Sequence, residues 1–178
     1  MVNSREKLLS PSAALNRFSP SEGAVTGIQP YERRQRTRYG MLIGDIGLLI
    51  DQATTCEIIE QTPIYPLPHM PHWQRGLINL RGNLVPVFDL KSLMELDQES
   101  SEKQWLLVLD RGEMAVGLFG DGLPRPVATT RPMDRLPPLP SVLRPHISQA
   151  FTFEGFVWLA FDHRSFFQSL ATRISGFG

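Results

Sequence analysis

Short apolar runs separated by turn residues recur along the chain from residue 39 onward. Two proline-rich loops, 63–71 and 132–145, interrupt these runs, and proline holds the backbone extended, so neither loop forms a long helix. Regularly spaced short strands with turn signals favour antiparallel barrels or sandwiches over a fold of alternating strands and helices. The predicted strands cover 39–43, 48–50, 56–59, 77–81, 84–88, 105–109, 114–119, 127–130, 147–153 and 156–161.

The clearest of these runs form one hairpin, 77–81 and 84–88. The sequence between them is Gly82-Asn83, which predicts a type II′ turn because glycine adopts a positive φ at no steric cost. Pro86 lacks a backbone donor and places the second strand at an edge or bulge. Arg81 lies next to this turn with no acidic neighbour in sequence. Its planar fork of donors suits a partner-binding surface, and a plain solvent-facing charge is the alternative.

An internal repeat relates residues 88–94 to residues 161–167. In both, an apolar strand ends in Phe-Asp, a basic residue and Ser follow, and two adjacent apolar residues come one turn later. We predict that Asp89 and Asp162 are N-caps of short helices, because a carboxylate accepts hydrogen bonds from the first turn. A catalytic carboxylate pair is the alternative for these two residues. The repeat predicts two similar lobes of mostly antiparallel strands, each closed by a short helix.

Composition divides the chain into segments. Residues 1–36 are rich in Ser, Pro and Ala and show no sustained period, so we expect a flexible N-terminal tail, or alternatively a short docking segment through Leu15 and Phe18. Gly120-Asp121-Gly122 is expected to end the strand before it, and the polar stretch 97–104 to be an exposed connector. The remaining predicted segments are a folded domain over 37–172, with intertwined lobes at about 39–97 and 105–170, and a C-terminal tail over 173–178.

Charge and cysteine content narrow the classes of function. The formal net charge is zero, which argues against a nucleic-acid footprint over the whole protein. The basic segment Arg33–Arg38 keeps a nucleic-acid-binding SH3- or OB-like barrel open as the alternative function. The single cysteine, Cys56, excludes an internal disulfide and is expected to be a small buried apolar group in a reducing compartment. No apolar run reaches the ~20 residues of a membrane span, so a cytoplasmic protein without direct membrane insertion is expected.

Residue patterns give little support for catalysis. His69 and His72 are three apart, but they lie in a proline-rich loop without a third ligand, so no metal site is predicted. The sequence also lacks a Gly-rich phosphate loop and a nucleophile elbow. We therefore expect no catalytic residue and no cofactor, and a small-molecule enzyme is the weakest of the alternatives.

The stretch from Tyr39 to Leu170 resembles the CheW-like domain of bacterial chemosensory systems. The strongest match is residues 75–82, RGLINLRG, followed by residues 85–90, VPVFDL. The dipeptide His72-Trp73 ahead of this match, with residues 81–84, looks closer to the PilI branch of the family, which serves type IV pilus (twitching) pathways. Weaker support comes from Gly44, residues 49–51 and 57–59, Pro68 and Pro71.

The resemblance implies a fold and a function. The fold is mainly β, with two five-stranded SH3-like barrels that share a core and carry short capping helices. The function is that of a non-catalytic adaptor, which couples chemoreceptors to a CheA-type histidine kinase in chemotaxis or twitching motility. The implied partners are the regulatory domain of the kinase and the cytoplasmic tip of methyl-accepting chemoreceptors, which would recruit the protein to membrane-associated receptor arrays.

The resemblance also implies site residues. Coupling to receptor and kinase is carried onto Glu57, Gly76, Asn79 and Arg81, and the sequence leaves open whether Glu57 and Arg81 form a pair. Thr55 and Cys56 depart from the family, which prefers an aliphatic residue at the Thr55 position. Apolar residues at strand ends are candidates for kinase docking, with ordinary core packing as the alternative: Leu48, Ile58, Ile59, Leu118 and Leu123.

Overall fold

The computed structural model describes residues 36–96 and 103–175 of the chain. The expected N-terminal tail, apart from its last residue, lies outside these residues, and so does the greater part of the expected connector 97–104. Within the described residues, no helix is long and apolar enough to cross a membrane.

The described part of the chain is mainly β, as predicted. Its helices are short: α2 (Leu90–Leu93), α3 (His163–Ser175) and the 3-10 turns η1 (Gly112–Met114) and η2 (Arg144–His146). The strands are β1 (Arg36–Ile43), β2 (Ile46–Leu49), β3 (Cys56–Ile59), β4 (Gln74–Leu80), β5 (Asn83–Phe88), β6 (Gln104–Leu109), β7 (Val116–Thr129), β8 (Ile147–Phe153) and β9 (Phe156–Phe161).

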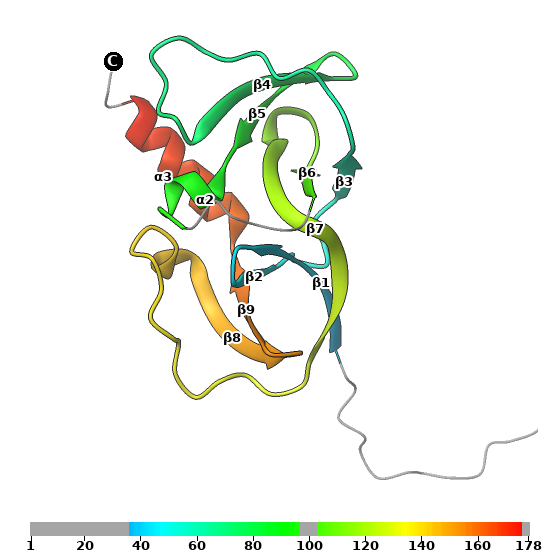
Figure 1. The fold of residues 1–178 in the computed structure, drawn as a ribbon, viewed down its shortest axis with the longest axis vertical. Helices are drawn as coiled ribbons and strands as arrows, with labels where there is room; N and C mark the ends of the chain where they lie inside the picture. The colour runs from blue at the N-terminus through cyan, green and yellow to red at the C-terminus, as the bar shows by residue number, and fades with distance from the viewer. Residues whose placement is uncertain (1–35, 97–102, 176–178) are drawn as a thin grey trace, which may run out of the picture. The chain divides into compact units, whose positions relative to one another are not determined.

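Strand β7 runs through both halves of the fold (Figure 1). Its first half pairs with β6 and its second half pairs with β1. The prediction that Gly120-Asp121-Gly122 ends a strand is therefore wrong, and the predicted runs 114–119 and 127–130 are parts of one strand. The physical reason lies in pairing, because at Asp121 the partner on one edge is Gln104 of β6 and the partner on the other edge is Leu42 of β1.

Each half of β7 belongs to its own five-stranded barrel. The first barrel has the order β3-β6-β7-β5-β4, and the second has the order β7-β1-β2-β9-β8. A bridge between Tyr65 and Leu77 joins the chain after β3 to β4 and closes the first barrel. A bridge between Pro132 and Phe151 joins the chain after β7 to β8 and closes the second.

The barrels are interleaved along the sequence. Strands β1 and β2 fall in the range 39–97 but pair with β7 and β9 in the second barrel, whereas β6 falls in the range 105–170 but pairs with β3 in the first. Helix α3 continues to Ser175, into the range expected for the C-terminal tail. Each helix has an aspartate at its start: Asp89 Oδ1 accepts from the Ser92 amide, and Asp162 Oδ1 accepts from the Ser165 amide.

Apolar side chains form three clusters. One fills the first barrel and one fills the second, where Trp158 is fully buried. The third lies between the barrels and takes residues from both of them and from α2 and α3, which makes it a shared core. Its members include Met41, Ile43, Leu48, Phe88, Leu90, Leu107, Leu118, Leu159, Phe166 and Leu170.

A buried ion pair joins α2 to the middle of β7. Lys91 Nζ lies 2.8 Å from Asp121 Oδ2, and the two side chains are only 3% and 6% exposed. The amide of Gly44, in the turn between β1 and β2, donates to the same carboxylate oxygen at 2.7 Å. Asp121 therefore ties a helix and a turn to the point where β7 passes from one barrel to the other. A buried charge of this kind is compatible with a stable fold only while its partner is present, because an unpaired buried charge is strongly destabilising.

This pair gives a first prediction. Changing Lys91→Met leaves the Asp121 carboxylate buried without its cation, which should lower the free energy of unfolding by about 3 to 5 kcal/mol. The double variant Lys91→Met/Asp121→Leu should recover most of this loss, because no isolated charge remains. Urea unfolding followed by circular dichroism measures both.

The matched control is Glu60→Gln, which removes an exposed pair between Glu60 and Lys103. Exposed pairs of this kind contribute about 1 kcal/mol or less, so the control should stay close to the parent protein. Equal losses for Lys91→Met and Glu60→Gln would contradict the role of the buried pair.

Candidate functional site

The turn between β4 and β5 presents Arg81 at its first central position. Leu80 pairs with Asn83, so the two-residue connection is Arg81-Gly82, with φ of 52° and 88°. Positive φ at both positions is typical of a type I′ turn. This corrects the expected type II′ turn at Gly82-Asn83, and the reason is a side chain. Asn79 Oδ1 accepts a hydrogen bond from the Gly82 amide at 2.9 Å, which stabilises the turn one residue earlier.

Arg81 and Glu57 form a two-pronged ion pair across 24 residues of sequence. Arg81 Nη1 donates to Glu57 Oε2 at 2.7 Å and Nη2 donates to Oε1 at 2.6 Å. These hydrogen bonds, with the charge of Glu57, raise the pKa of Arg81. The Arg81 side chain is 73% exposed, and exposed ion pairs contribute little to stability. The pair therefore fixes the geometry of two side chains at the surface rather than the fold.

An open cleft of about 510 Å³ adjoins this pair. Strands β3, β4 and β5 contribute to its walls together with the segment that follows β6. Its lining combines charged groups with an apolar floor, a combination suited to holding another protein surface. The lining residues are Glu57, Leu80, Arg81, Asn83, Val85, Asp110, Arg111, Gly112 and Ala115.

Gly76, by contrast, is buried and does not face a partner. Its φ is 131°, and a Cβ atom at this position would overlap the carbonyl group of Tyr65. Glycine is thus required for the close approach that allows the Tyr65–Leu77 bridge to close the first barrel. Gly76 and Asn79 act on the site through the backbone of the β4–β5 hairpin.

The five apolar candidates divide by burial. Leu48 and Leu118 are each 1% exposed and belong to the shared core, which corrects the expectation that they line a docking surface. Ile59 is half-buried and packs against the interior of the first barrel. Ile58 and Leu123 are 44% and 52% exposed and remain candidates.

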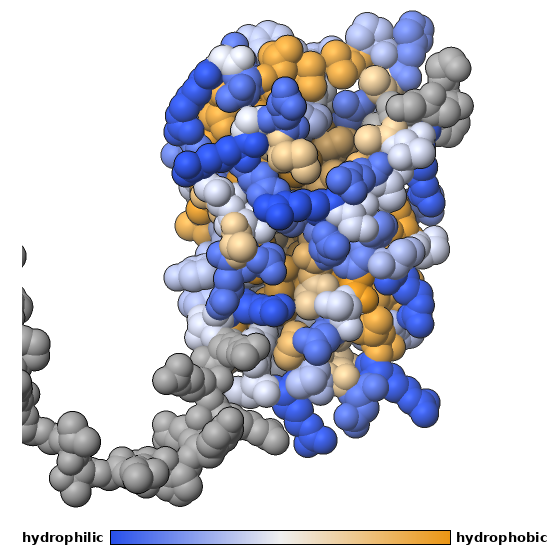
Figure 2. Space-filling view, turned by 180° about the vertical axis from the view of Figure 1, so that it is seen from behind, coloured by the Kyte–Doolittle hydropathy of each residue, from blue (hydrophilic) through white to orange (hydrophobic). Residues whose placement is uncertain are grey.

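Two strongly exposed apolar side chains that adjoin the cleft lining in sequence, Leu84 and Met114, escaped the sequence reasoning. Leu84 is 67% exposed and Met114 is 53% exposed. Alternation along β5 could have identified Leu84, because Val85 beside it points into the barrel and Leu84 must point outward. Figure 2 shows apolar side chains at the surface at the upper end of the folded domain, the end that β4 and β5 form in Figure 1.

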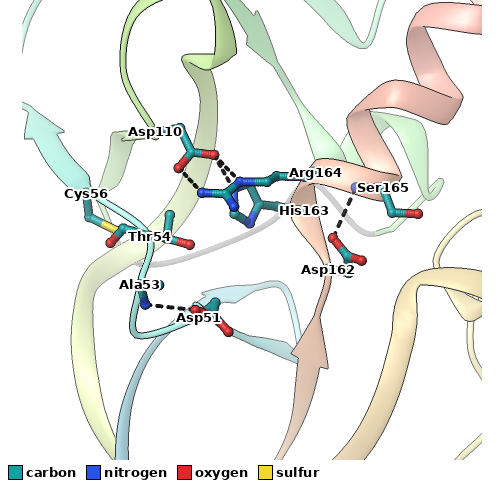
Figure 3. A network of polar contacts seen from close by, with 9 residues as sticks. All are labelled: Asp51, Ala53, Thr54, Cys56, Asp110, Asp162, His163, Arg164 and Ser165. Atoms are coloured by element: carbon teal, nitrogen blue, oxygen red, sulfur yellow. Dashed lines mark hydrogen bonds and ion pairs between the residues drawn. The ribbon is translucent and has the colours of Figure 1, made fainter.

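A second polar cluster joins the end of β6 to the start of α3 (Figure 3). Asp110 Oδ2 lies 2.8 Å from His163 Nε2 and accepts from Arg164 Nε at 2.9 Å, while Oδ1 accepts from Arg164 Nη2 at 2.7 Å. Hydrogen bonds from Arg164 are the main cause that lowers the pKa of Asp110, to about 2. The hydrogen bond and the charge of His163 also lower this pKa. None of these three residues was singled out from the sequence, because Asp110 and His163 are 53 residues apart in the chain.

Cys56 lies beside the same cluster. Its side chain is exposed, which corrects the expectation of a buried thiol. Partial burial, and then the negative charge of Asp110, raise the pKa of the Cys56 thiol. Among the residues that the structure describes, no group of three or more His, Cys, Asp or Glu side chains gathers to hold a metal ion.

The depressed pKa of Asp110 predicts a pH-dependent stability. Its pKa is about 2 in the folded protein against an ordinary value of 3.8, which corresponds to about 2 kcal/mol of stabilisation while the group is ionised in both states. This stabilisation is fully present above pH ~4 and is lost as the pH falls through about 2. Urea unfolding at a series of pH values should therefore show Asp110→Asn less stable by about 2 kcal/mol at pH 7, with the difference from the parent shrinking toward zero at pH ~2. A difference that does not change with pH would contradict this assignment.

Comparison with known proteins places the whole arrangement in one family. Residues 40–171 match the CheW-like domain. Protein PilI of Pseudomonas aeruginosa is 32% identical over 111 residues, which cover 60% of this chain and 61% of that protein. Chemotaxis protein CheW of Thermotoga maritima is 30% identical over 64 residues, which cover 36% of this chain and 42% of that protein. The chain thus matches less than two thirds of the length of either relative.

A solved structure agrees with the fold. The scaffolding protein TtCheW from Thermoanaerobacter tengcongensis superposes with a TM-score of 0.59 at 16% identity, over 72% of this chain and 89% of that chain. This likeness confirms the predicted pair of SH3-like barrels. The family match covers the two barrels from β1 to α3, and the chain therefore belongs to the family of CheW-like domains.

Proposed function

We propose that the protein is a non-catalytic adaptor that couples chemoreceptors to a CheA-type histidine kinase. The observation that carries the proposal is the Glu57–Arg81 pair, held at the surface beside an open cleft on a CheW-like fold. An adaptor needs rigid, exposed recognition groups rather than a reactive centre. A type I′ turn and a two-pronged ion pair supply that rigidity here.

The surroundings of the pair are suited to protein recognition. Leu84 and Met114 expose apolar area, and Arg111 adds a charge at the rim of the cleft. Apolar area gives about 25 cal/mol per Å² before the costs of association are subtracted. A modest apolar patch with charged neighbours therefore favours a specific contact of moderate strength, and clustering of many copies in an array would strengthen it.

Two partners follow from the family resemblance. One is the regulatory domain of the kinase, which would contact the barrels of this chain. The other is the cytoplasmic tip of a methyl-accepting chemoreceptor, which would recruit the protein to the membrane. The similarity to Protein PilI supports output through a type IV pilus pathway. Nucleic-acid binding through Arg33–Arg38 is not favoured, because residues 36–38 of this segment belong to β1 and pair with β7.

A charge-swap experiment tests the proposal. Arg81→Ala should leave the circular dichroism spectrum unchanged, because the pair is exposed, yet weaken binding to the kinase regulatory domain roughly tenfold. Calorimetry with that domain and receptor-dependent autophosphorylation of the kinase are the measurements. The double variant Glu57→Arg/Arg81→Glu rebuilds the pair with its charges exchanged. Binding should stay weak in this variant, because we propose that the partner interacts with the guanidinium at its present position.

Glu60→Ala is the matched control, since it removes an exposed pair in the same barrel outside the cleft. Its binding and its kinase control should equal those of the parent. Unchanged coupling in Arg81→Ala, with normal coupling in Glu60→Ala, would count against the proposed role of Arg81.

A further inference from the structure

We propose that Asp110, His163 and Arg164 form a clasp between the barrels that positions β3 and, with it, the Glu57 carboxylate. The three are positioning residues, and their effect on partner binding rests on the function proposed above. Asp110 is hydrogen-bonded both to α3 and to the residue that precedes β3 by one position. Its side chain accepts from His163 and Arg164 at the start of α3, and its backbone amide donates to the Thr55 carbonyl at 2.9 Å.

Strand β3 is held by a short ladder to β6, by Ile59 in the interior of the first barrel and by the Glu57–Arg81 pair at the surface. It is only four residues long, and among the described residues its strand partner is β6. The chain enters β3 from β2, which belongs to the second barrel, through residues 50–55. Figure 3 shows Asp51 and Thr54 of this crossing near His163 and Arg164. The position of β3 is therefore sensitive to contacts at the point where the crossing ends, which is Thr55.

The space around the crossing allows it to move. A cleft of about 370 Å³ lies there, with Asp51, Thr54, His163 and Arg164 among its lining residues. The charge of Asp51 also acts on Arg164, whose pKa is raised chiefly by its hydrogen bonds to Asp110. Within the crossing, Ile50 is buried in the shared core, whereas Asp51 and Thr54 line this open cleft beside His163 and Arg164.

Backbone strain at Asp110 links its side chain to the Thr55 contact. Asp110 has a φ of 60°, a left-handed conformation that costs energy for a residue other than glycine. The bonds from His163 and Arg164 hold the carboxylate, and hence the residue, in this conformation. Removal of those bonds allows the backbone to relax and to withdraw the amide from Thr55.

Glu57 is two residues beyond Thr55, on the strand that this contact begins. Arg81 is carried by its own turn, between β4 and β5, which places it beside Glu57 in the lining of the 510 Å³ cleft. A small displacement of β3 therefore changes the distance between the two partners of the recognition pair, although His163 and Arg164, unlike Asp110, do not line the cleft beside Arg81. In this way, contacts with the second barrel affect the geometry of the Glu57–Arg81 pair on the first barrel.

The test uses the full-length protein without partners first. In Asp110→Asn and Arg164→Gln, hydrogen–deuterium exchange of the backbone amides 56–59 should accelerate about tenfold, while exchange in β7 and β9 stays near the parent rate. Arg164 is half-exposed, so its variant should fold normally even if Asp110→Asn does not. Arg164→Lys keeps the charge but not the fork, and it should resemble Arg164→Gln if the geometry of the fork is what matters.

The alkylation rate of Cys56, the single cysteine of the chain, is an independent measure of accessibility at the start of β3. Opening of the clasp should speed its reaction with iodoacetamide in Arg164→Gln. Glu60→Gln is the matched control, because it breaks an exposed pair near the end of β3 that involves no group of the clasp. Unchanged exchange at 56–59 relative to this control would overturn the proposal, and so would an equal acceleration across β7 and β9, which would indicate a general loss of stability.

The same variants are then titrated with the kinase regulatory domain. A loss of affinity of about tenfold in Arg164→Gln, at a temperature far below its melting point, is the expected result for a positioning role. Local opening of β3 with unchanged affinity would overturn the link to recognition. If the parent protein itself does not bind kinase or receptor, the proposed function fails, whereas the exchange and alkylation data still decide whether the clasp positions β3.

Discussion

The constraint on which the fold depends is the passage of one strand through two barrels. Because β7 hydrogen-bonds to β6 in its first half and to β1 in its second, the barrels cannot rotate independently without breaking a sheet. The apolar cluster between them, which includes Phe88 and Phe166, adds a dry contact that belongs to neither barrel alone. A continuous strand and a shared core together make a single rigid carrier out of two small barrels, each of which would be marginal alone.

Burial decides what each charged pair does on this carrier. The Lys91–Asp121 pair is almost inaccessible, and the Asp121 carboxylate also accepts from the Gly44 amide, so the pair joins α2 to the crossover of β7. Glu57 and Arg81 have similar distances between their charged atoms, but the Arg81 side chain is 73% exposed and that of Glu57 is 34% exposed. Water screening leaves such a pair weak as a source of stability and available as a recognition group. The same chemistry thus stabilises the fold in one place and in the other lies at the surface, where we propose that it contacts a partner.

What the sequence predicts correctly is local. Strand positions follow from apolar runs between turn residues, and the caps at Asp89 and Asp162 follow from a carboxylate that directly precedes a helical turn. The errors concern features that depend on contacts between residues far apart in the sequence. The continuity of β7 depends on β1 taking over from β6, and the burial of Leu118 depends on a core that exists only when both barrels are assembled.

The candidate site shows the same division. The hairpin that carries Arg81 is recognisable from its residues. Its turn, however, lies one residue earlier than the position of glycine predicts, because the Asn79 side chain bonds the Gly82 amide. The Glu57–Arg81 pair joins residues 24 apart, and Asp110 meets His163 across 53 residues. No periodicity connects positions so far apart. Their contact follows from the interleaving of the barrels, which the repeat indicates only in outline.

The internal repeat, residues 88–94 and 161–167, places two basic residues with comparable structural roles. Lys91 and Arg164 occupy equivalent positions, each two residues after the aspartate that caps its helix. Lys91 reaches Asp121 and Arg164 reaches Asp110, so the two helices hold the β6–β7 hairpin at its opposite ends. The Lys91 side chain is 3% exposed and that of Arg164 is 52% exposed. Because water screens an exposed charge, the hairpin is held at the crossover by a fully buried pair and, at the end nearest β3, the strand that carries Glu57, by one buried partner, His163, and one exposed partner, Arg164.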